Sequence, residues 1–331
     1  MNFDLTQIIH DGTYFLISVL GKAVFAPLIR DSELYWFYWL SAFLIAWGFW
    51  RICLLNFSPN ALGFRENFLS KKIWLHPSAI RDYKFYLVNS LIMAWLFNSM
   101  WLDPIAIKSF LNEVSNVSLV DAPASKDTHV IVKIAYTLLF FVVYDFGRFV
   151  AHSLLHDVEL LWKFHQVHHS AEVLTPFTAY RVHAVDLAIM AWVPMIFTAT
   201  LTWIFEQGSG SGIGFYMFMG FHVIIWFFNL IDHLRHWHVW VTYGPVLNKW
   251  FISPAHHQLH HSADPRHWGC NRGYELAIWD RWYGTLVLPD ENPPALTLGL
   301  HEIDKEKWKF QWQLQLQPFI DAIKCIRFGN K

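Results

Sequence analysis

Five mostly apolar stretches, each long enough to form a membrane-spanning helix, constrain what this chain can fold into. They cover residues 34–55, 85–101, 130–150, 187–205 and 212–231. A helix that crosses the apolar part of a bilayer needs about 20 such residues. A sixth stretch, residues 13–29, is interrupted by Lys22, and an interfacial helix fits it as well as a span does. The sequence therefore predicts an all-α integral membrane protein with four to five transmembrane helices.

The composition supports a membrane setting. Only 15% of the residues are charged and 54% are hydrophobic, whereas soluble domains have about a quarter charged residues. The formal net charge of −1 gives no reason to expect nucleic acid as a partner.

The distribution of basic residues predicts the orientation. Residues 51–84 contain six basic residues and two acidic ones, namely Arg51, Arg65, Lys71, Lys72, Arg81 and Lys84 against Glu66 and Asp82. The loop at 103–127 is acidic on balance, and residues 206–212 contain no Lys or Arg. Because cytosolic loops are enriched in Lys and Arg, residues 51–84 are expected in the cytosol. Alternation through the spans then brings residues 151–186 and those after 231 to the same side, as a cytosolic helical cap.

The histidines of this predicted cap come in three groups with helical spacing. The groups are His152 with His156, then His165, His168 and His169, and lastly His257, His260 and His261. Residues three and four apart share a helix face, and imidazole is the commonest metal ligand in proteins. Eight imidazoles are too many for one tetrahedral ion, so the spacing predicts two metal ions.

Structural zinc, or a histidine-rich loop without function, would be the alternatives. Structural zinc sites often use cysteine, and no cysteine accompanies these groups. A zinc hydrolase would more typically have His-Glu-x-x-His, whereas His156 is followed by Asp157. Iron that activates oxygen is the better interpretation.

The order HxxxH, HxxHH, HxxHH on a membrane scaffold resembles the fatty acid hydroxylase / sterol desaturase superfamily of di-iron enzymes. The flanking segments 145–148, 161–165, 253–262 and 279–285 resemble it too, so that the resemblance covers roughly residues 130–290. It implies two iron ions as cofactor, with O₂ as co-substrate. The implied ligands are the eight histidines above together with His183 and His233. His236 or His238 could substitute for His233.

Asp145 precedes His152 by seven residues, two helical turns on the same face. It is expected to accept a hydrogen bond from a ligand imidazole, as carboxylates beside metal sites do, although a helix-packing contact is an equal alternative. Asp186, Asp264 and Asp280 are further candidates for such an acceptor.

The resemblance implies an O₂-dependent oxidoreductase that hydroxylates an acyl chain, a sterol or a lipid headgroup. Alternatives are a lipid or sterol desaturase with the same centre, or a metal-binding membrane protein without redox turnover. No haem, iron–sulfur or dinucleotide motif is found in the sequence, so an external electron donor such as a ferredoxin, a cytochrome or a reductase is expected. The expected organisation is 1–127 as N-terminal membrane helices and loops, 128–290 as catalytic region and 291–331 as cytosolic tail.

Overall fold

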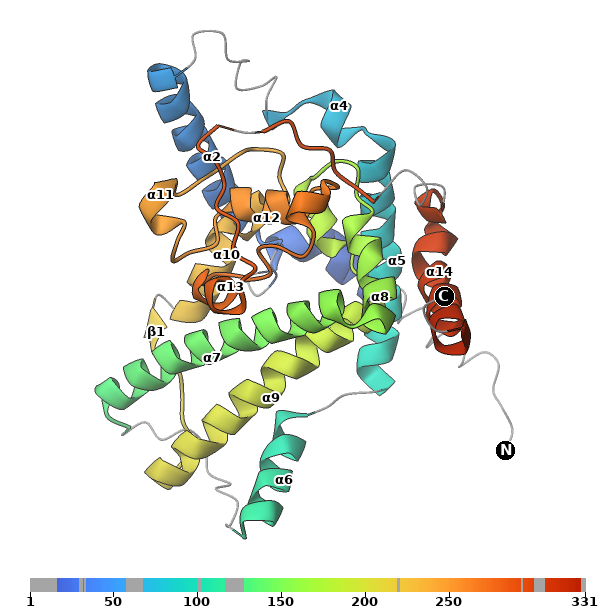
Figure 1. The fold of residues 1–331 in the computed structure, drawn as a ribbon. Coiled ribbons are helices and arrows are strands. Elements are labelled where there is room, and N and C mark those ends of the chain that lie inside the picture. The colour runs from blue at the N-terminus through green and yellow to red at the C-terminus, as the bar shows by residue number, and fades with distance from the viewer. Residues whose placement is uncertain are drawn as a thin grey trace.

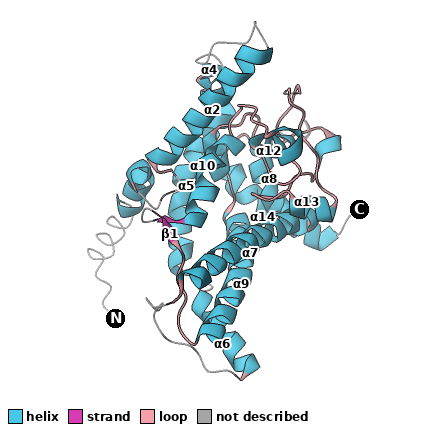
Figure 2. Cartoon of the chain, turned by 90° about the vertical axis from the view of Figure 1, so that its left-hand side faces the viewer, coloured by secondary structure: helices cyan, strands magenta, loops and turns pink. Residues whose placement is uncertain are grey.

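The structure, a computed structural model, describes residues 17–29, 32, 34–57, 68–99, 103–116, 128–218, 221–292, 294–300 and 307–328. Within these ranges helices are the dominant regular structure (Figure 2), as predicted, and the only ladder is the hairpin of β1 (Met217–Phe218) with β2 (Phe221–His222). The principal helices, in chain order, are α2 (Trp36–Phe57), α4 (Lys71–Trp74), α5 (Pro77–Ser99), α6 (Pro104–Ser115), α7 (Val130–Asp157), α8 (Glu159–His169), α9 (Ala184–Ser209), α10 (Val223–Arg235), α11 (Gly244–Leu247), α12 (Pro254–His260), α13 (Ile278–Tyr283) and α14 (Gln311–Phe328). Short 3₁₀ turns are η1 (Ala26–Leu28), η2 (Pro176–Tyr180) and η3 (Pro265–His267).

Helices α7 and α9 lie side by side over most of their length (Figure 1). Among the described residues, these two are long and apolar enough to cross a membrane. They contain the predicted spans 130–150 and 187–205. The carboxyl end of α7 and the amino end of α9 continue into the segments that carry the histidines.

A glycine allows the two helices to approach closely. A Cβ atom at Gly147 would lie 2.6 Å from the Cα of Pro194 on α9, so no larger residue fits without displacing a helix. Pro194 lacks an N–H for the helix ladder. The hydroxyl of Thr198 donates a hydrogen bond to the Pro194 carbonyl at 3.0 Å, one turn further along α9.

The other predicted spans have different outcomes. Residues 34–55 fall in α2, which packs against α10, and residues 85–101 overlap α5. The continuous span expected at 212–231 is wrong: a non-helical segment and the β1–β2 hairpin precede α10, which begins only at Val223. Glycine is a poor helix former, and Gly212 and Gly214 stand in this segment. The 13 residues of α10 extend about 20 Å, short of the roughly 30 Å of a bilayer core.

In the terminal regions, the described part of the 13–29 stretch is a short apolar helix, Ile17–Leu28. The 291–331 region contains α14, which packs on α8. Trp308 and Leu314 from this region join Phe85 of α5 and Val167 of α8 in one buried apolar cluster. The C-terminal helix thus covers the outer side of the helix that carries the second histidine group.

Candidate metal centre

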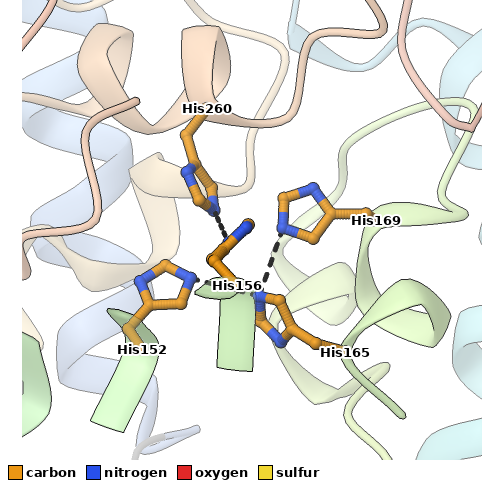
Figure 3. A group of neighbouring side chains, drawn as sticks. All are labelled: His152, His156, His165, His169 and His260. Atoms are coloured by element: carbon orange, nitrogen blue, oxygen red, sulfur yellow. Dashed lines mark hydrogen bonds between the residues drawn. The ribbon is translucent and has the colours of Figure 1, made fainter. Parts of the chain in front are cut away.

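Five histidines from three helices point their Nε2 atoms at one another (Figure 3). His152 and His156 extend from the end of α7, His165 and His169 from α8, and His260 from α12. The Nε2 of His165 is 3.1 Å from that of His152 and 3.2 Å from that of His169. The Nε2 atoms of His156 and His260 are 3.3 Å apart. We call this set the first histidine group.

Four further histidines form the second histidine group: His168, His236, His257 and His261, all buried. The Nε2 of His236 lies 3.1 Å from that of His168 and 2.8 Å from that of His257. The Nε2 atoms of His257 and His261 are 3.1 Å apart. Among the described residues, these two groups are those that could each hold a metal ion.

The two HxxHH sequences explain why the groups are adjacent. On α8, His165 and His169 are four residues apart and face the first group, while His168 faces the second. On α12 the arrangement is reversed, since His257 and His261 face the second group and His260 the first. Each box therefore contributes two ligands to one group and one to the other, which couples the positions of both groups to the same two helices.

The facing nitrogens of His152 and His165 are arranged as two ligands of one cation would be. The Nδ1–H of His152 donates to the carbonyl of Arg272 at 2.8 Å, because a carbonyl can only accept. The Nδ1–H of His165 donates to the carboxylate of Asp186 at 2.7 Å. In neutral rings both Nε2 atoms then carry lone pairs, and these lone pairs face each other at 3.1 Å without a proton. Such a contact is repulsive by itself, and a bound metal ion makes it favourable.

The distances also fit shared coordination. Two imidazole nitrogens bound to one ion at about 2.0–2.1 Å, as in zinc sites, are about 2.9 Å apart at a right angle and about 3.4 Å apart at a tetrahedral angle. The contacts within the groups span 2.8 to 3.3 Å. Burial lowers the pKa of His236 to about 4 and that of His260 to about 3, which keeps these imidazoles neutral at physiological pH. For His168, His169, His257 and His261, burial and then the neighbouring imidazoles hold the pKa well below its usual value.

The two groups differ in how their rings are held. In the first, His152 and His165 have the Nδ1 partners described above, and the Nδ1–H of His260 donates to the carbonyl of Cys270 at 2.6 Å. In the second, the Nδ1 atoms of His168, His236 and His261 are buried and have no hydrogen-bond partner among the described residues. The protein therefore fixes the tautomers of the first group more firmly.

The carbonyls that hold His152 and His260 belong to the segment 270–273, which Asp280 positions. Its Oδ1 accepts the Arg272 N–H at 2.7 Å, and its Oδ2 accepts the Gly273 N–H at 2.6 Å. A Cβ on Gly273 would lie 2.6 Å from the Asp280 Oδ2, so glycine is required for this approach.

Asp145 has no hydrogen bond to a histidine in the part of the chain that the structure describes. Its carboxylate accepts the backbone N–H of Glu275 at 2.8 Å and of Leu276 at 3.1 Å, and the indole N–H of Trp279 at 2.8 Å. The hydrogen bond expected from a ligand imidazole is therefore not the one that Asp145 forms. Asp145 instead connects α7 to the segment after Gly273 and to α13. Asp186, one of the other candidates, has the contact predicted for Asp145.

Two of the ten predicted ligands lie outside both groups. The Nδ1 of His183 accepts the Val185 N–H and caps α9, and its Nε2–H donates to the carbonyl of Gln315 on α14. The ring of His233 packs against Trp39 in a tilted arrangement, with 4.6 Å between centroids. His236, one turn after His233, lies in the second histidine group, where His233 was predicted. The eight box histidines are all brought together.

Sequence reasoning missed Arg181, which organises the end of α8. Arg181 and Asp82 are both fully buried and form an ion pair at 2.9 Å. The Nε–H of Arg181 donates to the Val167 carbonyl and its Nη2 to the Ser170 hydroxyl at 2.7 Å. These contacts bracket His168 and His169. The only feature of the sequence that could have drawn attention to Arg181 is its position two residues before His183.

Cavities adjoin the histidines from two sides. One, of about 400 Å³, is bordered by His156, His169, His260 and His261 together with Trp268. The other, of about 310 Å³, is bordered by histidines of both groups and by residues of α5 and α9. The centre can therefore be reached by small molecules without unfolding the cap.

Fold and site together define a protein with long apolar helices and two histidine groups that could each hold a metal ion. The comparisons identify the class: residues 137–285 match the family model "Fatty acid hydroxylase". This match confirms the resemblance predicted from the histidine boxes for residues 137–285, which are a little less than half of the chain.

The curated relatives carry out oxidations of lipids. The chain is 31% identical over 159 residues to ornithine lipid hydroxylase OlsE of Rhizobium tropici, covering 48% of this chain and 44% of that one. It is 30% identical over 150 residues to alkylglycerol monooxygenase of Xenopus tropicalis, covering 45% and 30%. It is 24% identical over 200 residues to Delta(7)-sterol 5(6)-desaturase of Eremothecium gossypii, covering 59% and 48%. The matches thus span less than half of these relatives' lengths, and no solved structure matches.

Proposed function

We propose that this protein is a di-iron membrane oxidoreductase that uses O₂ to hydroxylate a lipid. The observation that carries the proposal is the pair of facing lone pairs on His152 and His165, within two adjacent groups of buried imidazoles. Iron bound by these groups would supply the activation of O₂ that oxidation of an unactivated C–H bond needs. The names of the relatives support a lipid as the substrate.

The residues of the chain have defined tasks in this proposal. The first group and the second group each hold one iron. Asp186 and the carbonyls of Cys270 and Arg272 keep three imidazoles in the tautomer whose Nε2 can bind metal. Eight of the nine histidines are buried and His156 is half-buried, which limits the access of bulk water to the centre. Electrons come from an external one-electron carrier.

The decisive experiment measures metal content and O₂ consumption of the purified protein. We expect about two irons per chain, and O₂ uptake that depends on added reductant and on lipid. His168→Ala and His260→Ala should each lower the iron content and abolish uptake while the protein still inserts in the membrane. Tightly bound zinc with no uptake would support the non-redox alternative instead.

A desaturase is the second candidate, because one relative is a sterol desaturase. Mass spectrometry of the product separates the two: hydroxylation adds 16 mass units to the lipid, whereas desaturation removes 2, since one oxygen atom is gained or two hydrogens are lost.

We further propose four to five membrane helices, with the histidine groups facing the cytosol. Because the stretch 212–231 is not one continuous helix, the chain must return to that side in another way between Ser209 and His236, which contacts His168. The basic residues between α2 and the middle of α5 support this orientation. A cysteine at Ser209 should react with an impermeant thiol reagent only from the non-cytosolic side, and one at Ser262 only from the cytosol. Reaction of both from the same side would contradict the topology.

A further inference from the structure

The smaller cavity beside the metal centre, which we call the inner chamber, touches both histidine groups. It is bordered by His152 and His165 of the first group and by His168, His236 and His257 of the second. Its volume of about 310 Å³ is at the lower end of the range of small-molecule pockets, which is about 300–1,000 Å³. Any part of a substrate that reaches the centre by this route must fit into this chamber.

The inner chamber is bordered by a polar side chain that is almost fully buried. Asn89 borders it and is only 5% exposed. Its Nδ2–H donates to the Val182 carbonyl at 3.0 Å, which fixes the orientation of the amide. The Asn89 Oδ1 is buried and has no hydrogen-bond partner among the described residues. A buried acceptor without a donor is unfavourable, so this oxygen indicates a ligand that donates a hydrogen bond.

Charged side chains of both signs border the same chamber. Asp232 borders the inner chamber, and its Oδ1 accepts the hydroxyl of Tyr274 at 2.7 Å. The guanidinium of Arg148 also borders it and lies over the Tyr274 ring at 3.4 Å. Hydrocarbon placed against these groups would desolvate them without compensation. The chamber is therefore suited to the polar end of a lipid.

An apolar groove adjoins the inner chamber. It has a volume of about 560 Å³ and lies between the helix Ile17–Leu28, α2, α5 and η2. Val24, Leu87 and Phe177 are among its lining residues, none of which is charged. Tyr86 borders both the groove and the inner chamber. The Tyr86 hydroxyl donates to the Ala23 carbonyl at 3.0 Å, which places this side chain at the junction.

We propose that the inner chamber binds the polar end of a lipid that carries hydroxyl or amine donors, while the apolar groove holds its hydrocarbon chain. The inference rests on the proposed function and adds that the oxidised carbon lies close to the polar end. In the reaction, the C–H bond breaks and a C–O bond forms with one atom of O₂. The second oxygen atom leaves as water after it takes up two protons and two electrons. An external iron–sulfur or haem protein delivers the electrons one at a time.

The test uses two synthetic lipids with identical acyl chains, one with free hydroxyl and amine groups on its headgroup and one with these groups fully methylated. Iron-free protein in detergent is incubated with an equimolar mixture, and the retained lipids are quantified by mass spectrometry. We expect roughly tenfold preference for the donor-bearing lipid, the effect of about one hydrogen bond. The preference should collapse in Asn89→Leu, which removes the unpartnered acceptor.

Leu87→Ala is the matched control, because it shortens a wall of the apolar groove and leaves Asn89 in place. It should lower the retention of both lipids and keep their ratio. Equal retention of the two lipids by the wild-type protein overturns the inference, as does an unchanged ratio in Asn89→Leu.

The position of oxidation is a second readout, obtained with the iron-loaded protein by tandem mass spectrometry of the product. A new hydroxyl within a few bonds of the headgroup supports the inference, and one far along the acyl chain overturns it while leaving the proposed function intact. Failure of the proposed function can be distinguished from failure of this inference. In the former case O₂ uptake and product would be missing, but the lipid preference of the iron-free protein would still decide what the chamber binds.

Discussion

Replacing Asp186 by asparagine tests whether the chain prepares the first histidine group for metal. The carboxylate of Asp186 is 1% exposed and accepts the Nδ1–H of His165 at 2.7 Å. Asparagine keeps the shape, but its amide oxygen is a weaker acceptor, because hydrogen bonds to charged groups are roughly twice as strong as those between neutral ones. Loss of such a partner typically costs 10–100-fold in metal affinity, which corresponds to about 1.4–2.7 kcal/mol.

The effect should be confined to one of the two metals. His165 is within hydrogen-bonding distance of His152 and His169, which are both in the first group. The rings of the second group have no contact with Asp186 among those described. We therefore expect Asp186→Asn to lower the affinity of one metal by 10–100-fold and to leave the other nearly unchanged.

The assay is a chelator titration of metal-loaded protein in detergent, with residual metal measured by mass spectrometry. Asp264→Asn is the matched control, since Asp264 pairs with Arg266 in an exposed turn away from both groups. If Asp186→Asn retains both metals as the wild type does, or releases both together, the assignment of Asp186 to the first group is wrong.

Three further predictions concern stability and are measured by unfolding in detergent. Gly147→Ala should destabilise the protein by about 1–3 kcal/mol through overpacking against Pro194, and an unchanged midpoint would show that α7 and α9 yield easily. Asp145→Asn should cost about 1–3 kcal/mol for each N–H left without an acceptor; if it altered metal affinity without affecting stability, Asp145 would act on the ligands after all. Metal-free protein should weaken as the pH falls below 6.5, because unfolded histidines bind protons there while folded His236 and His260, with pKa values of about 4 and 3, stay neutral. Each should cost about 2 kcal/mol by pH 5, and a flat stability from pH 7 to 5 would contradict this burial.

The helical class and the box histidines could be predicted because both depend on short-range spacing. An i, i+4 pair shares a helix face wherever that helix packs, so His165 with His169 and His257 with His261 could be paired from the sequence. Their division between two groups could not be predicted. It depends on how α8 and α12 cross, which is set by distant contacts such as that between Gln258 and the carbonyls of Trp237 and Val239.

The partners of the ligands were harder to predict for the same reason. Asp145 was chosen from its offset to His152 along one helix, but on α7 that side of the helix meets the segment after Gly273. Asp186 reaches His165 because the chain turns at η2 between α8 and α9, and the buried pair of Arg181 and Asp82 holds this turn. No local periodicity encodes that path.

The two histidine groups share helices α8 and α12, but they differ in the hydrogen-bond acceptors that orient their imidazoles. This difference affects how the centre binds metal. Three of the five imidazoles of the first group are oriented by Asp186 and by carbonyls of a segment that Asp280 fixes. Three of the four in the second group have no such acceptor among the described residues. Because acceptors of this kind raise metal affinity, the first group should bind its metal more tightly, with the second following once the shared helices α8 and α12 are in place. Loading would then be sequential, because the tighter first group fills at a lower metal concentration than the second.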